Sequence, residues 1–178
     1  MGNKKLAIIG YGRHGKDTVA EILRDKFGYQ FLSSSEASAK IFLYDLLKDE
    51  FGYNSWQECF EDRHNHRERW FDEISKFNTP DKSRLAKLIM QENDVYVGMR
   101  CEHELDACKE SGVFDLVIWV DASNRVQYKE SENSCTVKPS QADLFINNDG
   151  TELELEFIVS VLYKEYLGGD TSEHSYAM

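Results

Sequence analysis

The sequence of 178 residues predicts an α/β fold in three layers, with a parallel sheet of about five strands and helices on both of its faces. Short apolar runs of strand length recur along the chain, and stretches with the 3.6-residue period of an amphipathic helix separate them. A glycine-rich turn joins the first apolar run to the first helical stretch. Because a helix separates successive strands, the chain crosses back before each new strand, and the strands are expected to be parallel.

The chain begins with a strand, a turn and a helix. Residues 5–9 form the first apolar run, and residues 16–27 carry apolar side chains at helical spacing. Gly28 follows in the position typical of a glycine that ends a helix. Residues 29–32 then predict a second, short strand.

The middle of the chain predicts helices, because its apolar residues recur at helical spacing. Ser33 or Ser35 caps the first of them, and Ser55 opens the second with the Ser-x-x-Glu spacing of a capping box. Asn78 to Asp81 form a clear stop. The predicted helices cover residues 33–51, residues from 55 onwards, 67–77 and 83–93.

The last part of the chain returns to alternating strands and helices. Its most apolar run, residues 115–120, predicts a core strand. Residues 121–138 are polar and contain few large aliphatic side chains, which favours a mobile flap. The other predicted elements are strands at 94–99 and 143–146 and helices at 102–111 and 151–167.

Residues 10–18 carry the strongest functional signal in the chain. Gly10, Gly15 and Lys16 fit the G-x-x-x-x-G-K frame of a P-loop, in which backbone N–H groups surround a phosphate and the lysine reaches the terminal phosphates of a nucleotide. The predicted nucleotide contacts in this segment are Gly10, Gly12, His14, Gly15, Lys16, Asp17 and Thr18.

One position departs from the P-loop frame. Ser or Thr is expected after the lysine, whereas this chain has Asp17 there and the hydroxyl one residue later, at Thr18. Asp17 is either an acidic residue that favours the first helical turn or a ligand of Mg²⁺, which prefers carboxylate and phosphate oxygens. Asp17 and Thr18 are therefore the predicted metal ligands.

Ligands of parallel sheets bind beyond the carboxyl ends of the strands. The predicted strand order therefore places the phosphate loop and several distant segments at one edge of the sheet. These segments are Ser33 to Ser35, Arg100, Asp121 and Asn147 to Gly150.

Charge and composition exclude several classes of protein. With 21 basic and 32 acidic residues the formal net charge is −11, which repels a nucleic-acid backbone over most of the surface. Basic residues are concentrated at 63–69, which indicates a local anion site. No apolar run approaches the roughly 20 residues that a membrane span needs. We therefore expect a cytoplasmic protein without a membrane partner, and nucleic acid at most as a locally bound acceptor.

Four segments together resemble one known family, the bacteriophage deoxynucleoside monophosphate kinases. They are the Gly-Lys-Asp-Thr of residues 15–18, Asp62-Arg63 in an inserted helical region, Arg100 at the end of a strand before residues 102–107, and Asn148-Asp149-Gly150-Thr151. The similarity runs from about residue 5 to 167, and it is most specific at the first and last of these motifs.

The resemblance implies a single P-loop kinase domain over residues 1–167. Its core would comprise residues of about 1–35 and 94–167, and a helical acceptor-binding insertion would span about 36–93. A short lid would cover about 122–140, and 168–178 would be a disordered tail. The implied reaction transfers the γ-phosphoryl group of ATP to a deoxynucleoside monophosphate (dNMP) with the help of Mg²⁺.

The resemblance also implies roles for individual residues. Lys16, Arg13, Arg100 and Arg125 would be catalytic, since phosphoryl transfer depends on positioning and on neutralising the charge of the transferred group. Ser34, Ser35, Arg63, Arg67 and Arg100 would bind the acceptor, and Asn148 and Gly150 would lie against the adenine of ATP. The residues alone leave other interpretations open, because serines after a strand are ordinary helix caps and arginines on a helix pair with acidic neighbours.

Two other functions stay open at this point. The acceptor could be a hydroxyl, in a phosphorylated small molecule or in a hydroxymethylated pyrimidine of phage DNA. Alternatively, the chain is a nucleotide-binding module without turnover. The sequence also leaves open whether the chain forms a homodimer.

Overall fold

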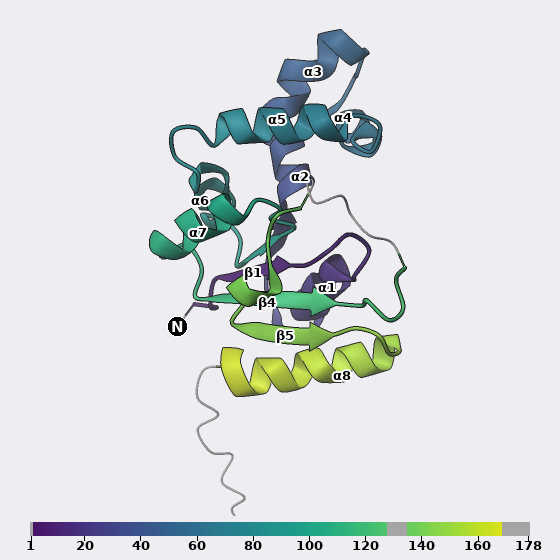
Figure 1. Cartoon of the computed structure of the whole chain (residues 1–178), viewed down its shortest axis with the longest axis vertical. Helices are drawn as coiled ribbons and strands as arrows, with labels where there is room; N and C mark the ends of the chain where they lie inside the picture. The colour runs from purple at the N-terminus through teal and green to yellow at the C-terminus, as the bar shows by residue number, and fades with distance from the viewer. Residues whose placement is uncertain (1, 128–134, 169–178) are drawn as a thin grey trace, which may run out of the picture.

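The computed structural model describes residues 2–127 and 135–168. Its sheet has five strands in the order β2-β3-β1-β4-β5, and every neighbouring pair is parallel. The predicted three-layer α/β fold with a five-stranded parallel sheet is therefore confirmed (Figure 1). The strands are β1 (Leu6–Ile9), β2 (Phe31–Ser33), β3 (Val95–Val97), β4 (Leu116–Asp121) and β5 (Leu144–Asn147).

The helices occupy the predicted segments, with ends that differ by a few residues. They are α1 (Lys16–Phe27), α2 (Ser34–Ser38), the π-helical η1 (Ala39–Leu43), α3 (Tyr44–Phe51), α4 (Trp56–Asp62), α5 (Arg67–Phe77), α6 (Arg84–Met90), α7 (Glu102–Glu110), the 3₁₀ turn η2 (Pro139–Gln141), α8 (Glu152–Leu162) and the π-helical η3 (Tyr163–Leu167).

Each face of the sheet is covered by its own group of helices, because side chains alternate along a strand. Ile8 and Ile118 point to the face where α1 and α8 pack. Ala7, one residue before Ile8, and Trp119, one residue after Ile118, point to the face covered by α6 and α7. All four side chains are buried, so the central strands are apolar on both faces, as expected of a parallel sheet.

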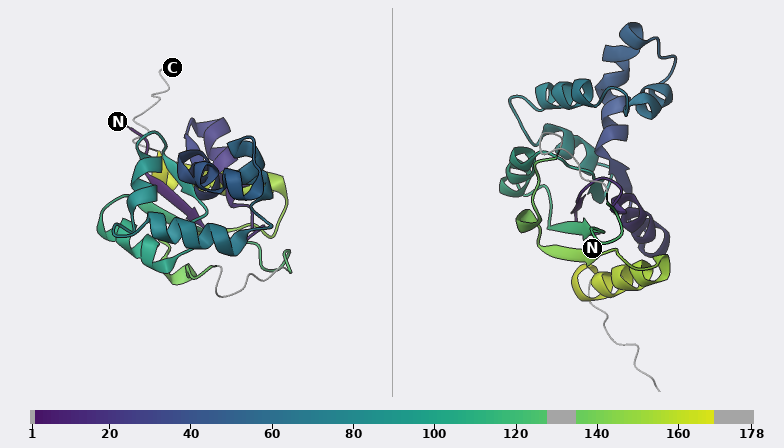
Figure 2. Two further views of the ribbon diagram at one scale, coloured as in Figure 1. Left: turned by 90° about the horizontal axis from the view of Figure 1, so that it is seen from above. Right: turned by 45° about the vertical axis from the view of Figure 1, so that its right-hand side comes forward.

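The helices between β2 and α6 carry a third apolar cluster of their own. It is centred on Leu43, Leu47, Cys59 and Trp70. Figures 1 and 2 show α3, α4 and α5 at one end of the molecule, while α8 lies at the opposite end. The insertion is thus a separate layer of helices that rises from the edge of the sheet where the strands end.

One long helical rod joins the insertion to the sheet. It runs through α2, η1 and α3, and Ser33 caps its start by accepting a hydrogen bond from the N–H of Glu36. In the middle of the rod the N–H of Tyr44 bonds to the carbonyl of Ala39, five residues back, which defines a π turn. The sequence predicted one regular helix here, and the π turn was not anticipated.

Parts of two predicted segments lie outside the described residues, namely 128–134 of the expected lid and 169–178 of the expected tail. The expected lid at 122–140 is described only at its two ends, and of the expected disordered tail only Gly168 is described. Among the described helices, none is long and apolar enough to cross a membrane.

Candidate nucleotide and phosphate site

The phosphate loop lies between β1 and α1 and has the backbone that a phosphate cradle needs. Gly10 and Gly15 have φ of +141° and +91°, and Arg13 also has a positive φ of +65°. A Cβ atom on Gly10 would collide with the carbonyl of Val120 in β4, so only glycine fits there. The loop therefore turns sharply while it stays pressed against the end of the neighbouring strand.

Lys16 is held inside this loop. Its side chain is only 8% exposed, and its ammonium donates to the carbonyl of Tyr11 at 2.7 Å. An amine in this position, at the first turn of α1, can exchange that carbonyl for phosphate oxygens when a nucleotide binds. The structure thus places the lysine where the P-loop motif predicts it.

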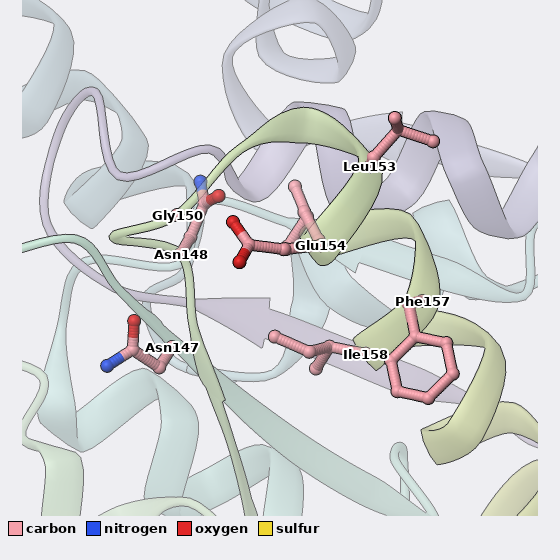
Figure 3. A pocket seen from close by; sticks show the side chains of 8 residues that line it. Asn147, Asn148, Gly150, Leu153, Glu154, Phe157 and Ile158 are labelled. Atoms are coloured by element: carbon pink, nitrogen blue, oxygen red, sulfur yellow. The ribbon is translucent and has the colours of Figure 1, made fainter.

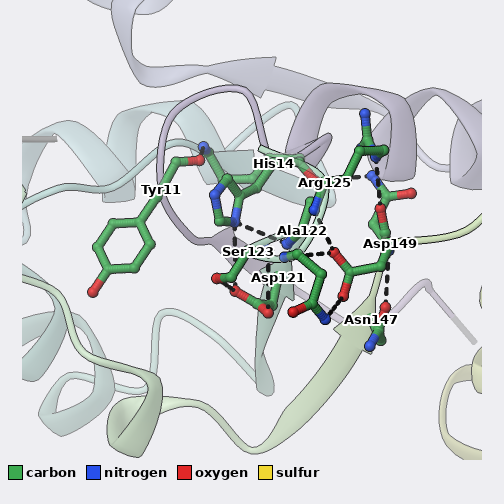
Figure 4. Close-up of polar contacts among 11 residues, drawn as sticks. Tyr11, His14, Asp121, Ala122, Ser123, Arg125, Asn147 and Asp149 are labelled. Carbon is green, nitrogen blue, oxygen red and sulfur yellow. Dashed lines mark hydrogen bonds and ion pairs between the residues drawn. The ribbon is translucent and has the colours of Figure 1, made fainter. Parts of the chain in front are cut away.

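The side chain of His14 points into the protein rather than toward a ligand (Figure 4). Its imidazole is 2% exposed, and Nδ1 accepts a hydrogen bond from the N–H of Ala122 at 2.9 Å. The carboxylate of Asp121 lies 3.6 Å from the same nitrogen. His14 was predicted to contact the nucleotide; its side chain is buried here, and such a contact stays a prediction.

The loop after β5 is bonded to the phosphate loop and to the segment after β4. The side-chain amide of Asn148 donates to the carbonyl of His14 at 2.9 Å, and it fills the space that a Cβ on Gly15 would need. The carboxylate of Asp149 accepts from the N–H groups of Asn124 and Arg125. Sheet geometry predicted that these segments meet, and they form one hydrogen-bonded edge.

Arg125 is exposed, and its Nε donates to the carbonyl of Asn148 at 3.1 Å. It therefore lies beside the predicted adenine-contacting residues Asn148 and Gly150. A pocket of about 430 Å³ opens on the other side of this loop, between it and the first turns of α8 (Figure 3). Asn148, Gly150, Leu153 and Ile158 are among the residues that line it.

The charges of the predicted arginines act together on His64, which lies in the basic segment 63–69 predicted to be a local anion site. The pKa of His64 is lowered by partial burial and then by the positive charges around it. Those charges come from the phosphate loop, from the end of α4, from the start of α5 and from the segment after β3. In order of their effect they are Arg63, Arg67, Arg100 and Arg13.

Arg63 connects this cluster to the phosphate loop. Its guanidinium lies over the ring of Phe60 at 3.9 Å and donates to the carbonyl of that residue at 2.7 Å. Burial lowers the pKa of Arg63, and the carboxylate of Asp17 acts in the opposite direction. Asp17 and Arg63, far apart in sequence, are therefore electrostatic neighbours, and the cluster faces the start of α1.

Arg67 lies at the start of α5 and donates to Nδ1 of His64 at 3.2 Å. Arg100 lies just after β3, where its carbonyl accepts from the N–H of Thr136 at 2.7 Å. The expected pairing of Arg63 and Arg67 with acidic helix neighbours is not among the described ion pairs. Arg67 is exposed and Arg63 half-buried, so the alternative of a solvated helix face stays open for these two arginines.

The predicted serines have structural partners. Ser34 Oγ donates to the carbonyl of Gly98 at 3.1 Å, which ties the start of α2 to the end of β3. Ser35 lies in the first turn of α2 and is half-buried, but it is not the cap, because that position belongs to Ser33. Both serines lie at the edge of the sheet where the arginines gather, and their contact with an acceptor stays a prediction.

The residues present fit a magnesium nucleotide. Asp17 is exposed and Thr18 half-exposed in the first turn of α1, and they follow Lys16, the residue predicted to bind the phosphates. No group of three or more His, Cys, Asp or Glu side chains is close enough to hold a metal by itself within residues 2–127 and 135–168. Mg²⁺ needs no such group, since it keeps several waters and takes one or two carboxylates plus phosphate oxygens.

No protein-family model matches the chain, and no curated protein matches it in sequence. Solved structures match its fold. Shikimate kinase from Aquifex aeolicus aligns with a TM-score of 0.52 and 13% identity over 90% of this chain and 96% of its own. TT1252 from Thermus thermophilus aligns with a TM-score of 0.52 and 18% identity over 94% and 100%.

A third match is the shikimate kinase from Acinetobacter baumannii in complex with shikimate, with a TM-score of 0.51 and 13% identity over 92% of this chain and 95% of its own. At such low identities the likeness concerns the fold and not the substrate. The chain has the three-layer α/β fold of P-loop kinases.

Proposed function

We propose that this protein transfers the γ-phosphoryl group of ATP to the phosphate of a deoxynucleoside monophosphate. The observation that carries the proposal is that Arg13, Arg63, Arg67 and Arg100 share the surroundings of His64, to which Arg67 bonds at 3.2 Å, and that Arg63 also interacts with the charge of Asp17 at the phosphate loop. A loop that binds one phosphate chain does not require a second cationic site. A second cationic site is needed when the protein also binds a second anion. A guanidinium group suits a phosphate acceptor, because it can donate two parallel hydrogen bonds to two phosphate oxygens.

The roles of the residues follow from their positions. Lys16 and the loop N–H groups hold the β- and γ-phosphates, and Arg63 and Arg67 hold the acceptor phosphate. Arg13 comes from the phosphate loop and Arg100 from the segment after β3, and in this proposal both stabilise the charge that develops on the transferred group. When bound, Mg²⁺ neutralises the β- and γ-phosphate oxygens, and Asp17 and Thr18 are the residues placed to hold it.

A hydroxyl acceptor is the second candidate. Kinases named for shikimate, a hydroxylated acid, share the fold over most of this chain. Such an acceptor also carries an anionic group that arginines can bind.

The proposal of a cytoplasmic enzyme acting on nucleotides rather than on DNA depends on the net charge of −11, which disfavours a long nucleic-acid groove.

An acceptor panel tests the proposal. Transfer from γ-labelled ATP with Mg²⁺ would be measured for the four dNMPs, for shikimate and for DNA that contains hydroxymethyluracil. We expect at least one dNMP to be labelled far faster than the other acceptors. Labelling of only a hydroxyl acceptor would replace the proposal by the second candidate, and ATP binding without labelling of any acceptor would favour a binding module.

A further inference from the structure

His14 has an unusual place for a residue in a phosphate loop. Its neighbour Arg13 is exposed, whereas His14 itself is 2% exposed. The positive φ of Arg13 turns the chain so that the next side chain points back into the protein. The imidazole then packs edge-on against the ring of Tyr11, with centroids 5.7 Å apart.

The imidazole bonds the phosphate loop to the end of β4. Nδ1 accepts the N–H of Ala122 at 2.9 Å, and both groups are buried. A nitrogen that accepts a hydrogen bond carries no proton, so neutral His14 carries its proton on Nε2. A buried N–H group without an acceptor is costly, so Ala122 depends on this nitrogen.

The backbone of His14 makes the second bond, to the loop after β5. Its carbonyl accepts from the side-chain amide of Asn148 at 2.9 Å, and Asn148 is itself 6% exposed. The loops after β4 and β5 are also bonded to each other, through Asp149 and the N–H groups of Asn124 and Arg125. His14 therefore joins the phosphate loop to both neighbouring loops, and Figure 4 shows these contacts together.

We propose that His14 is a positioning residue for ATP: its Nδ1 atom fixes the phosphate loop in the shape that binds the triphosphate. This inference rests on the proposed function, because it assumes that the loop binds ATP. Without the Nδ1 acceptor, the loop would move to satisfy the N–H of Ala122 with water, and the loop N–H groups would lose their common direction.

Three substitutions at this position separate the role of the acceptor from that of the ring. In His14→Asn the amide oxygen lies at the position of Nδ1, so it can still accept from Ala122. In His14→Gln the same amide sits one carbon further out and misses that position. His14→Leu keeps a comparable volume and has no acceptor.

The experiment measures ATP affinity by calorimetry on the full chain with Mg²⁺, together with the thermal midpoint of each variant. We expect His14→Asn to bind ATP within about threefold of the unsubstituted protein, and His14→Gln and His14→Leu to bind about tenfold more weakly. A role in stability alone would lower the thermal midpoint of the Gln and Leu variants and leave their ATP affinity unchanged, and that result would overturn the inference.

Measuring ATP binding instead of turnover keeps the two proposals apart. If the unsubstituted protein does not bind ATP, the proposed function fails. If it binds ATP and the Gln and Leu variants bind equally well, the inference about His14 fails and the proposed function stands. If the Gln or the Leu variant does not fold, the remaining one is compared with the Asn variant. A loss of ATP affinity in the Asn variant as large as in the remaining variant would also contradict the role of Nδ1.

Discussion

Lys16 is the residue whose removal tests the phosphate loop most directly. Its ammonium donates to a backbone carbonyl of the same loop, and its side chain belongs to none of the apolar clusters, so Lys16→Ala removes charge without breaking an apolar core. We expect phosphoryl transfer to fall by about 10² or more, with little change in the circular dichroism spectrum. Near-normal turnover in this variant would remove the loop from the mechanism.

Arg63 tests the acceptor site in the same way. Arg63→Ala should raise the KM of the acceptor about tenfold or more and leave the KM of ATP nearly unchanged, because it removes a cation from the acceptor side alone. Arg24→Ala is the matched control, since Arg24 lies in the last turn of α1 and pairs with its neighbour Asp25. Equal effects of the two substitutions on acceptor KM would contradict the assignment.

Glu104 is a buried acid outside this site, and it makes stability depend on pH. It is 8% exposed, burial raises its pKa, and Asn78 Nδ2 donates to it at 2.9 Å. In the window between the ordinary and the raised pKa, the folded state binds more protons than the unfolded state. The contribution of Glu104 to stability therefore falls as pH rises through this window.

Glu104→Gln removes the titration but keeps an oxygen that can accept from Asn78. We expect the unfolding free energy of this variant, compared with that of the unsubstituted protein, to be more favourable at about pH 7 than at about pH 4. Urea denaturation at both pH values measures the difference in unfolding free energy. A difference that stays constant, or that reverses sign, would show that Glu104 does not titrate in the expected direction.

At the scale of elements, the phosphate loop requires glycine at position 15, which a comparison with Gly112 can test. Gly15 has φ of +91° and its missing Cβ is replaced by the side chain of Asn148, whereas Gly112 has φ of +64° with open space around it. Gly15→Ala should therefore abolish ATP binding, while Gly112→Ala should cost only about 1 kcal/mol of unfolding free energy. Calorimetric ATP titration and urea denaturation of both variants measure these effects.

The order of strands and helices could be read from the sequence, because it depends on apolar spacing and on glycine and serine at element ends. The π turns at η1 and η3 could not, since a shift from four to five residues leaves the apolar pattern of a helix nearly intact. The choice of Ser33 over Ser35 as the cap was likewise open, because both precede the same helix.

The candidate site was predictable only in part, for a related reason. Strand order predicted which segments share an edge, and the structure brings them together there. The inward direction of His14 depends on the backbone turn at Arg13 and on the N–H of Ala122, neither of which a motif contains. His64 and Asp149 lie in segments that the sequence placed at the site, but their individual contacts were not predicted, because Arg100 and Arg13 act on His64 and Asn124 bonds to Asp149 from distant parts of the chain. The signal available for His64 was its place among the basic residues 63–69.

At the scale of the whole molecule, the acidic surface opposes nucleic acid while the arginine cluster attracts small anions. With a net charge of −11, we expect duplex DNA to bind more weakly than about 10⁻⁴ M at physiological salt, as measured by fluorescence anisotropy. The same protein should bind a dNMP under these conditions. Tight DNA binding would favour a DNA acceptor. Whether the chain forms a homodimer stays a prediction that sedimentation can test.

The π turn in the rod between sheet and insertion has a consequence for how the two substrates meet. Everything beyond η1, including Arg63, is carried on that rod. A regular helix turns by about 100° per residue, so losing one residue from the α-helical part of the rod, in α3, would turn the distal helices by about that angle about the rod axis. Under the proposed function, the direction in which Arg63 faces the phosphate loop therefore depends on the number of residues in this one rod.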